Sequence, residues 1–154
     1  MKNTNENSIS TLNDLVEICK DGQQGFQTAA KDAKDADLAQ TFNHYAAQRT
    51  QYMTELQRQI RNLGGDPDRH GTVSGTLHRG WINLKAALTS DEPHAVLVEC
   101  ERGEDAAVKS YREALAKTDL DPETRSLIQR QYESVIAAHD RIRNLRDSGV
   151  HATR

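Results

Sequence analysis

Proline, glycine, cysteine and aromatic residues are all scarce in this chain of 154 residues. It contains 3 Pro and 9 Gly, so few positions interrupt a helix, and Ala, Leu, Gln, Arg, Glu and Lys are frequent. No run of residues has the pattern of a β-strand. The composition and the length predict one all-α domain with a sizeable core.

Long apolar runs and an excess of one charge are also absent. No stretch of about 18 apolar residues could span a membrane, and the first residues, MKNTNENSIS, lack the apolar segment of a signal peptide. The 20 basic and 23 acidic residues are mixed along the chain and leave a formal net charge of −3. This balance favours neither nucleic acid nor a membrane as a partner. We therefore expect a soluble, cytoplasmic protein.

The two cysteines are too few and too far apart to form a disulfide framework. Cys19 and Cys100 lie on apolar faces of predicted helices, where free thiols are commonly buried. Glu104, one turn from Cys100, would raise the pKa of that thiol and blunt its reactivity. The chain also lacks a phosphate-binding glycine loop, a Cys-x-x-Cys pair and a nucleophile elbow. We assign no catalytic residue.

Apolar residues recur at helical spacing in five segments of the chain. They predict helices at about 10–33, 37–63, 72–89, 94–117 and 122–147. In domain terms, residues 1–9 would be a disordered tail, residues 10–147 the helical domain and residues 148–154 a polar tail. Gly22 and Gly25 in the first helix mark either a loose turn or a place where a neighbour packs closely.

The lengths of the connections predict how the helices are arranged. The first two long helices and the last two are each joined by a short linker, so each pair should form an antiparallel hairpin. Residues 64–93 are a long crossover with a short extra helix, whose 17 or so residues would span about 25 Å. Its single tryptophan, Trp81, should anchor packing. Two hairpins joined by one crossover are typical of a ferritin-like four-helix bundle.

Each long helix carries a polar residue on its apolar face, and the four residues lie at similar heights. They are Gln23, Arg49, Glu104 and His139. A buried carboxylate without a partner costs several kcal/mol or takes up a proton. We therefore predict a buried polar network in which Arg49 and Glu104 are partners. The alternative for Arg49 is that its long side chain reaches the solvent.

Several runs resemble one known family. They are LNDLVEICKDGQQGF, NHYAAQRTQYMTEL, GTLHRGWINLKAAL, VLVECERGEDAAVKSYREAL and QYESVIAAHDRIRNLRD. The family is an uncharacterised bacterial group of ferritin-like four-helix-bundle proteins, catalogued as a domain of unknown function, and the resemblance covers about residues 10–147. It implies a ferritin-like bundle of bacterial origin with a loose link to stress-induced genes. It implies no established activity.

A ferritin-like fold raises the question of a di-metal site. Such a site takes a Glu from each of two helices and a Glu-x-x-His motif from each of the other two, and this chain contains no Glu-x-x-His. The Arg49 guanidinium would also oppose two metal ions. We therefore expect no cofactor. The alternative is one weakly held ion, iron or manganese, on Glu101, Glu104 and His139.

Three classes of function remain after these exclusions. The chain could be a non-enzymatic, stress-associated structural or interaction protein with an unknown protein partner. It could be a metal-binding or oxidase-like member of the ferritin superfamily, or a binder of a small ligand in the bundle core. The incomplete ligand set favours the first class and a non-enzymatic role. Self-association into a homo-oligomer stays open.

Overall fold

The protein is an all-α bundle in the computed structural model, which describes residues 4–67, 81, 83–90 and 92–148. Its elements are α1 (Thr4–Asp32), α2 (Ala36–Asn62), α3 (Leu84–Thr89), α4 (Pro93–Leu115) and α5 (Pro122–Ser148). The described residues contain no strand, and none of their helices is long and apolar enough to cross a membrane. The predicted all-α class is confirmed.

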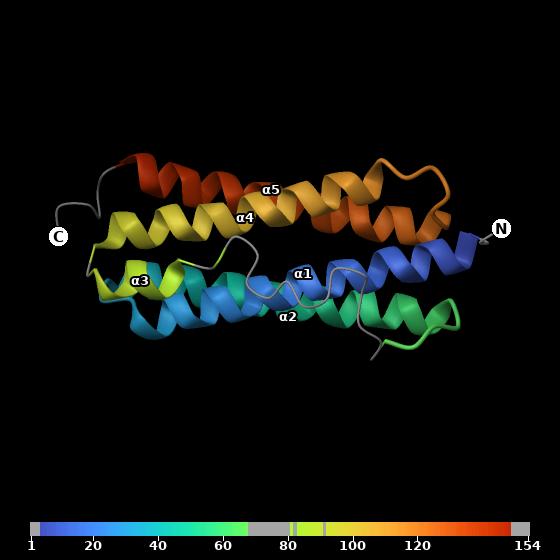
Figure 1. The fold of residues 1–154 in the computed structure, drawn as a ribbon, viewed down its shortest axis with the longest axis horizontal. Coiled ribbons are helices and arrows are strands. Elements are labelled where there is room, and N and C mark those ends of the chain that lie inside the picture. Colours follow the sequence, from blue (N-terminus) through green and yellow to red (C-terminus); the bar gives the residue numbers. More distant parts are fainter. Residues whose placement is uncertain (1–3, 68–80, 82, 91, 149–154) are drawn as a thin grey trace.

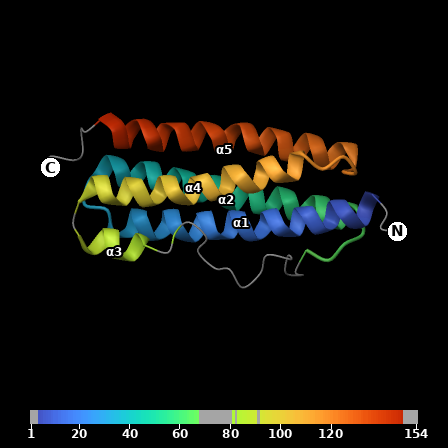
Figure 2. The same cartoon turned by 45° about the horizontal axis from the view of Figure 1, so that its top comes forward.

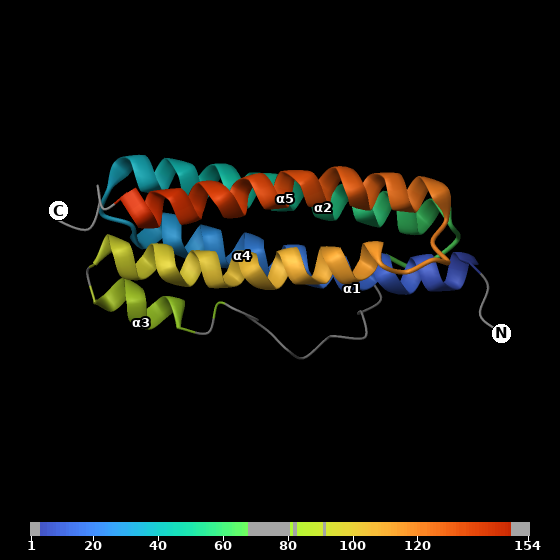
Figure 3. The same cartoon turned by 90° about the horizontal axis from the view of Figure 1, so that it is seen from above.

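The four long helices form two antiparallel hairpins, α1–α2 and α4–α5 (Figure 1). Helices α2 and α4 run in the same direction, as the two short linkers predict (Figures 1 and 2). Around the bundle, α1 lies beside α2 and α4, and α5 also lies beside both, so α2 and α4 face each other diagonally (Figure 3). Helix α3 packs outside the four, against α1 and α4.

Local capping explains where two of the long helices begin. The Asp35 side chain accepts hydrogen bonds from the backbone N–H groups of Asp37 and Leu38, at 2.9 and 3.1 Å, and so caps α2. The Asp121 carboxylate likewise accepts from the Thr124 backbone N–H at 3.1 Å, directly before Pro122 opens α5. Capping residues in the two short polar linkers therefore determine where the second helix of each hairpin begins.

The N-terminal tail predicted over residues 1–9 is wrong for residues 4–9, because α1 already begins at Thr4. Ser8 is fully buried, and its hydroxyl accepts a hydrogen bond from the Asp121 backbone N–H at 2.8 Å. Asn7 donates to Asp119 in the same α4–α5 linker. These contacts from a distant part of the chain order a segment whose composition is polar. Residues 1–3 and 149–154 lie outside the described residues.

The crossover helix predicted at 72–89 is also corrected. The described helix is Leu84–Thr89, and residues 81 and 83 lie in a turn before it, while residues 68–80 and 82 are outside the described part. Trp81 is 5% exposed and is the packing anchor of this turn. Its ring lies against Gly25 of α1 and Gly103 of α4, where an added Cβ would overlap the indole. Close packing, by a side chain, is thus the reason for Gly25.

The apolar core consists of two clusters, one toward each end of the bundle. One contains Leu12, Leu56 and Tyr111, and the other contains Phe26 and Trp81. Each of the four long helices contributes to both clusters. The two clusters leave a layer near the middle of the helices, and the ion pair described next fills it.

Candidate functional site

Arg49 of α2 and Glu104 of α4 form a bidentate ion pair across the diagonal of the bundle. Nη1 and Nη2 of Arg49 donate to Oε1 and Oε2 of Glu104, both at 2.6 Å. The side chains are 1% and 0% exposed. Two parallel charged hydrogen bonds of this length are the strongest pairing these groups can make. The predicted contact is present, and Arg49 does not reach the solvent.

The surroundings of the pair are shaped to hold the guanidinium. A Cβ added at Gly22 would lie 3.1 Å from Arg49 Nη1, so this glycine leaves room for the side chain. The Phe26 ring centroid is 5.6 Å from Arg49 Cζ, within the range of a cation–π contact. Burial lowers the pKa of Arg49, but the charge and hydrogen bonds of Glu104 outweigh this and raise the pKa above its ordinary value. Arg49 therefore stays charged.

A second buried polar chain lies about two helical turns from the ion pair, counted along α4 from Glu104 to Tyr111. Gln131 of α5, 1% exposed, accepts a hydrogen bond from the Tyr111 hydroxyl at 2.6 Å and donates to Glu55 Oε1 at 2.9 Å. The Tyr111 oxygen is 3.2 Å from Cys19 Sγ. With the Tyr111 proton directed to Gln131, the Cys19 thiol donates. Sequence analysis missed Gln131, although it stands three residues after Ile128 on the same helical face.

Burial controls the acidity of the thiols and of this tyrosine. It raises the pKa of Cys19 to about 11, although Arg49 and the hydrogen bond to Tyr111 act in the opposite direction. Burial also raises the pKa of Cys100 and of Tyr111 well above their ordinary values. Both cysteines are free and buried, as predicted. Neither thiol has the low pKa of a nucleophile.

Gln23 and His139 do not join the ion pair. Gln23 is only partly buried, and its Nε2 donates to Thr50 Oγ1 at 2.6 Å. His139 is 14% exposed and lies at the seam between α4 and α5. Of the four residues predicted to form one network, the structure thus joins Arg49 with Glu104 and turns the other two toward the flanks.

His139 is surrounded by carboxylates. Its Nε2 is 2.6 Å from Asp105 Oδ1 and 3.7 Å from Glu101 Oε2, and its Nδ1 is 3.1 Å from Asp140 Oδ1. Burial lowers the pKa of His139, but the hydrogen bonds to Asp140 and Asp105 and the nearby acidic charges outweigh it and raise the pKa above its ordinary value. These contacts bring together a group of possible metal ligands, and sequence analysis identified only some of its members.

The metal ligands predicted from the sequence need one correction. Glu101 and His139 lie together, but Glu104 does not join them, because both of its oxygens are bound by Arg49. The third member is Asp105, one residue further along α4 and one turn from Glu101. The two acids at i and i+4 were the available signal. In the described part of the chain, this is the only group of three or more His, Cys, Asp or Glu side chains that could hold a metal ion.

A di-metal centre does not fit this bundle. Arg49 lies in the middle of the core, and its guanidinium binds both oxygens of Glu104. The carboxylate nearest the centre is therefore neutralised, and a cation stands where two metal ions would need anionic ligands. The sequence provides no Glu-x-x-His motif to replace it.

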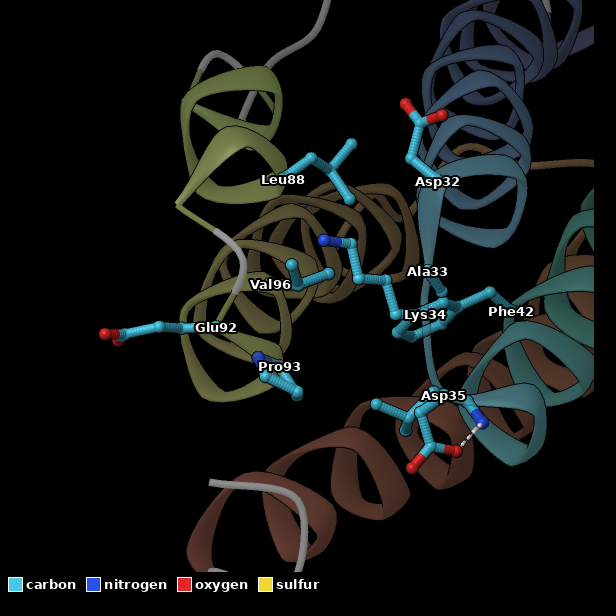
Figure 4. A pocket seen from close by; sticks show the side chains of 10 residues that line it. Asp32, Ala33, Lys34, Asp35, Phe42, Leu88, Glu92, Pro93 and Val96 are labelled. Carbon is cyan, nitrogen blue, oxygen red and sulfur yellow. Dashed lines mark hydrogen bonds between the residues drawn. The ribbon is translucent and has the colours of Figure 1, made fainter. Parts of the chain in front are cut away.

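Hollows in the described part of the surface include a small pocket and an open groove. A pocket of about 30 Å³ lies where α1, α2, α3 and α4 meet, and Figure 4 shows the Lys34 side chain reaching toward Leu88 across it. That volume suits a water molecule. A larger groove of about 400 Å³ runs along the seam of α2 and α5, lined in part by Gln48, Tyr52 and Ser134.

This α2–α5 groove is polar and continues toward the end of the bundle. Glu55 and Arg130 line both the 400 Å³ part and an adjoining hollow of about 510 Å³, whose walls include Arg58 and Glu123. The groove therefore carries acids and bases from both helices. One buried oxygen at its wall, Gln48 Oε1, has no hydrogen-bond partner among the described residues.

Comparison with known proteins identifies a family for this chain. Curated proteins give no match. Residues 7–117, well over half of the sequence, match a family described as Domain of unknown function. The match begins three residues after the start of α1, includes α2, α3 and α4, and ends in the linker before α5. The chain therefore belongs to the family described as Domain of unknown function (DUF2383).

Proposed function

We propose that this protein is a non-enzymatic bundle that acts through its surface, as a structural or interaction protein of the bacterial cytoplasm that serves under stress. The single observation that carries the proposal is the closed centre of the bundle. Arg49 and Glu104 are both buried and bind each other through two hydrogen bonds. Within this pair, neither charged group is left to meet a substrate.

The ion pair has a structural role in this proposal. It connects α2 of the first hairpin to α4 of the second across the diagonal of the bundle (Figure 3). Sliding one hairpin along the other by a helical turn would separate two buried charges, which is costly. The pair therefore fixes the register of the hairpins, a role that buried polar groups have in other helical assemblies.

The partner that fits this surface is a protein rather than a nucleic acid or a membrane. The α2–α5 groove carries two acids, Glu55 and Glu123, and two bases, Arg58 and Arg130. Such a balanced surface can pair with a second copy of itself about a two-fold axis, because each acid can meet a base. A homodimer through this groove is accordingly the interaction that we propose.

The experiment compares two variants in a bacterial strain that lacks its own copy of the gene. The double variant Arg49→Met with Glu104→Leu removes the polar centre, and Arg130→Glu changes the groove. We expect the first to restore growth under heat or oxidative stress as the unmodified protein does, and the second to fail. Circular dichroism of both purified variants checks that they fold. If the folded double variant fails to restore growth, the polar centre takes part in the function and the proposal is wrong.

A further inference from the structure

We propose that Glu101, Asp105 and His139 form a binding site for one divalent transition-metal ion, such as Zn²⁺, at the seam between α4 and α5. The site lies apart from the Arg49–Glu104 pair and goes beyond the surface role proposed above. One ligand atom of each residue lies within 4.8 Å of the other two. One imidazole nitrogen and two carboxylate oxygens form a ligand set that first-row divalent ions accept.

The distances allow the ion to enter with a small movement. Zinc bonds of about 2.0–2.1 Å in tetrahedral geometry place ligand atoms about 3.3 Å apart. His139 Nε2 and Glu101 Oε2 are 3.7 Å apart, close to this value. His139 Nε2 and Asp105 Oδ1, at 2.6 Å, must separate, and the Asp105 side chain is free to turn because it is 63% exposed. The exposed side also gives the ion and a water ligand access.

Asp140 supplies the outer contact that orients the imidazole. A carboxylate can only accept, so the Nδ1 position of His139 donates to Asp140 Oδ1 across 3.1 Å. Nε2 then faces Glu101 and Asp105. Without an ion its proton binds Asp105, and with an ion the metal takes the place of that proton, which leaves to solvent. A carboxylate behind a metal-bound histidine is common in protein metal sites.

The neighbouring cations limit how strongly the site can bind. Arg146 contacts Glu101 through Oε1 and leaves Oε2 to face His139. Arg143 Nη2 is 3.4 Å from Asp140 Oδ1. Two guanidinium groups thus oppose three carboxylates, so the site has a small negative charge once the Nε2 proton of His139 has left. We expect a weak site that is filled when free metal is plentiful.

Binding of the ion would link two helices. Glu101 and Asp105 belong to α4, and His139 belongs to α5. An ion bound to all three would hold the second hairpin together, and a ligand that binds only the folded state raises its stability. The melting temperature of the protein should therefore rise with zinc concentration.

The test is a calorimetric titration of chelator-stripped protein with zinc chloride, run beside melting curves. We expect one equivalent to bind, with affinity at least tenfold lower in His139→Gln and about tenfold lower in Asp140→Asn. His44→Gln is the matched control, because His44 is an exposed histidine of α2 that lines the α2–α5 groove and is not a member of the group at the α4–α5 seam. It should bind zinc as the unmodified protein does.

Two results would overturn the proposal. One is the absence of zinc binding and of any rise in melting temperature at millimolar zinc. The other is zinc binding that His139→Gln leaves unchanged, or that His44→Gln weakens equally, because the ion would then bind surface histidines only. Melting curves without metal show whether each variant folds. Should His139→Gln not fold, Asp105→Asn, at an exposed position, replaces it in the same comparison.

Discussion

Arg49 and Glu104 each depend on the other to remain buried and charged in the core. Neither charge could stay buried alone, since an isolated charge costs many kcal/mol in a low-dielectric interior. The bidentate geometry and the space left by Gly22 hold the guanidinium in one place. The bundle should therefore be stable when both charges are present or both are absent, and less stable when only one remains.

The first prediction tests this dependence. Arg49→Met and Glu104→Leu should each lower the free energy of unfolding by about 3–5 kcal/mol, because each leaves an uncompensated buried charge. The double variant should recover much of that loss, since apolar residues of similar volume can replace a buried pair. Urea denaturation measures all three. Strictly additive losses, with coupling below about 0.5 kcal/mol, would contradict the observed contact.

The second prediction concerns Cys19, whose pKa rises from 9.0 to about 11 on folding. Between these pH values the unfolded chain loses the thiol proton while the folded chain keeps it. The free energy of unfolding contributed by Cys19 is therefore complete below pH 9 and is lost as the pH rises toward 11. The groups that act on this thiol are Arg49, Tyr111, Glu104 and Glu55.

Urea denaturation from pH 8 to 10.5 measures this effect. The unmodified protein should lose stability more steeply than Cys19→Ala above pH 9, by at most about 1.4 kcal/mol per pH unit. Iodoacetamide at pH 8 should leave Cys19 unmodified in the folded protein and alkylate it in urea. Parallel pH curves for the two proteins would show that the thiol does not control alkaline stability.

At the scale of the elements, Trp81 anchors the described part of the crossover to the bundle, beside the apolar residues of α3. Trp81 packs against Gly25 of α1 and Gly103 of α4, and its ring meets Phe26 edge-on with centroids 5.0 Å apart. Both helices have a glycine at this contact, and the missing side chains leave room for the indole ring between them. This contact fixes the position of the segment that connects the first hairpin to the second.

The third prediction follows from that fit. Gly25→Ala or Gly103→Ala should destabilise the protein by about 1–3 kcal/mol, because the added methyl overlaps the indole ring. This loss exceeds the gain of about 1 kcal/mol that Ala brings to a helix. The emission of Trp81, the only tryptophan, should shift to the red as the ring becomes exposed. Gln27→Ala, at an exposed position of α1, is the control and should leave the emission unchanged.

The N-terminal turn of α1 supports the linker of the second hairpin. Ser8 accepts the Asp121 backbone N–H, and Lys117 Nζ donates to Thr11 Oγ1 at 2.7 Å. Both contacts join residues more than 100 positions apart in the chain. The first turns of α1 are therefore part of the core of the fold.

The fourth prediction is that Ser8→Ala lowers the free energy of unfolding by about 1–3 kcal/mol, because the Asp121 N–H loses its partner in a buried place. Ser10→Ala, a change of the same kind at a less buried serine, should cost less. Thermal denaturation of both variants provides the comparison. Equal and small effects would mean that this end of α1 is held by other contacts.

At the scale of the whole molecule, the middle of the bundle holds the Arg49–Glu104 pair, in which both oxygens of the buried carboxylate are bound by the guanidinium. The fifth prediction is that protein purified without chelator carries well under one equivalent of iron, manganese or zinc. Arg49 binds both oxygens of Glu104, and the one ligand group found among the described residues, at the α4–α5 seam, should bind weakly. Mass spectrometry of the metals measures the content. Two tightly bound ions per chain would contradict the description of the core.

Helical periodicity and the linker lengths were sufficient to predict the two hairpins, the parallel course of α2 and α4, and the contact between Arg49 and Glu104. Periodicity says which face a residue occupies, and heights follow from counting turns. It cannot give side-chain torsions or distant neighbours. For that reason Asp105, Gln131 and the helical residues 4–9 were missed, since long-range contacts decide all of them.

The ion pair also has a consequence for how relatives of this chain can evolve. Losing either charge alone removes about 3–5 kcal/mol from a total stability that is typically 5–15 kcal/mol. A lineage that changes position 49 must therefore change position 104 soon afterwards, or first acquire stability elsewhere. Across diverged members of the family, the two positions should covary, with both charged or both apolar, and mixed pairs should be rare.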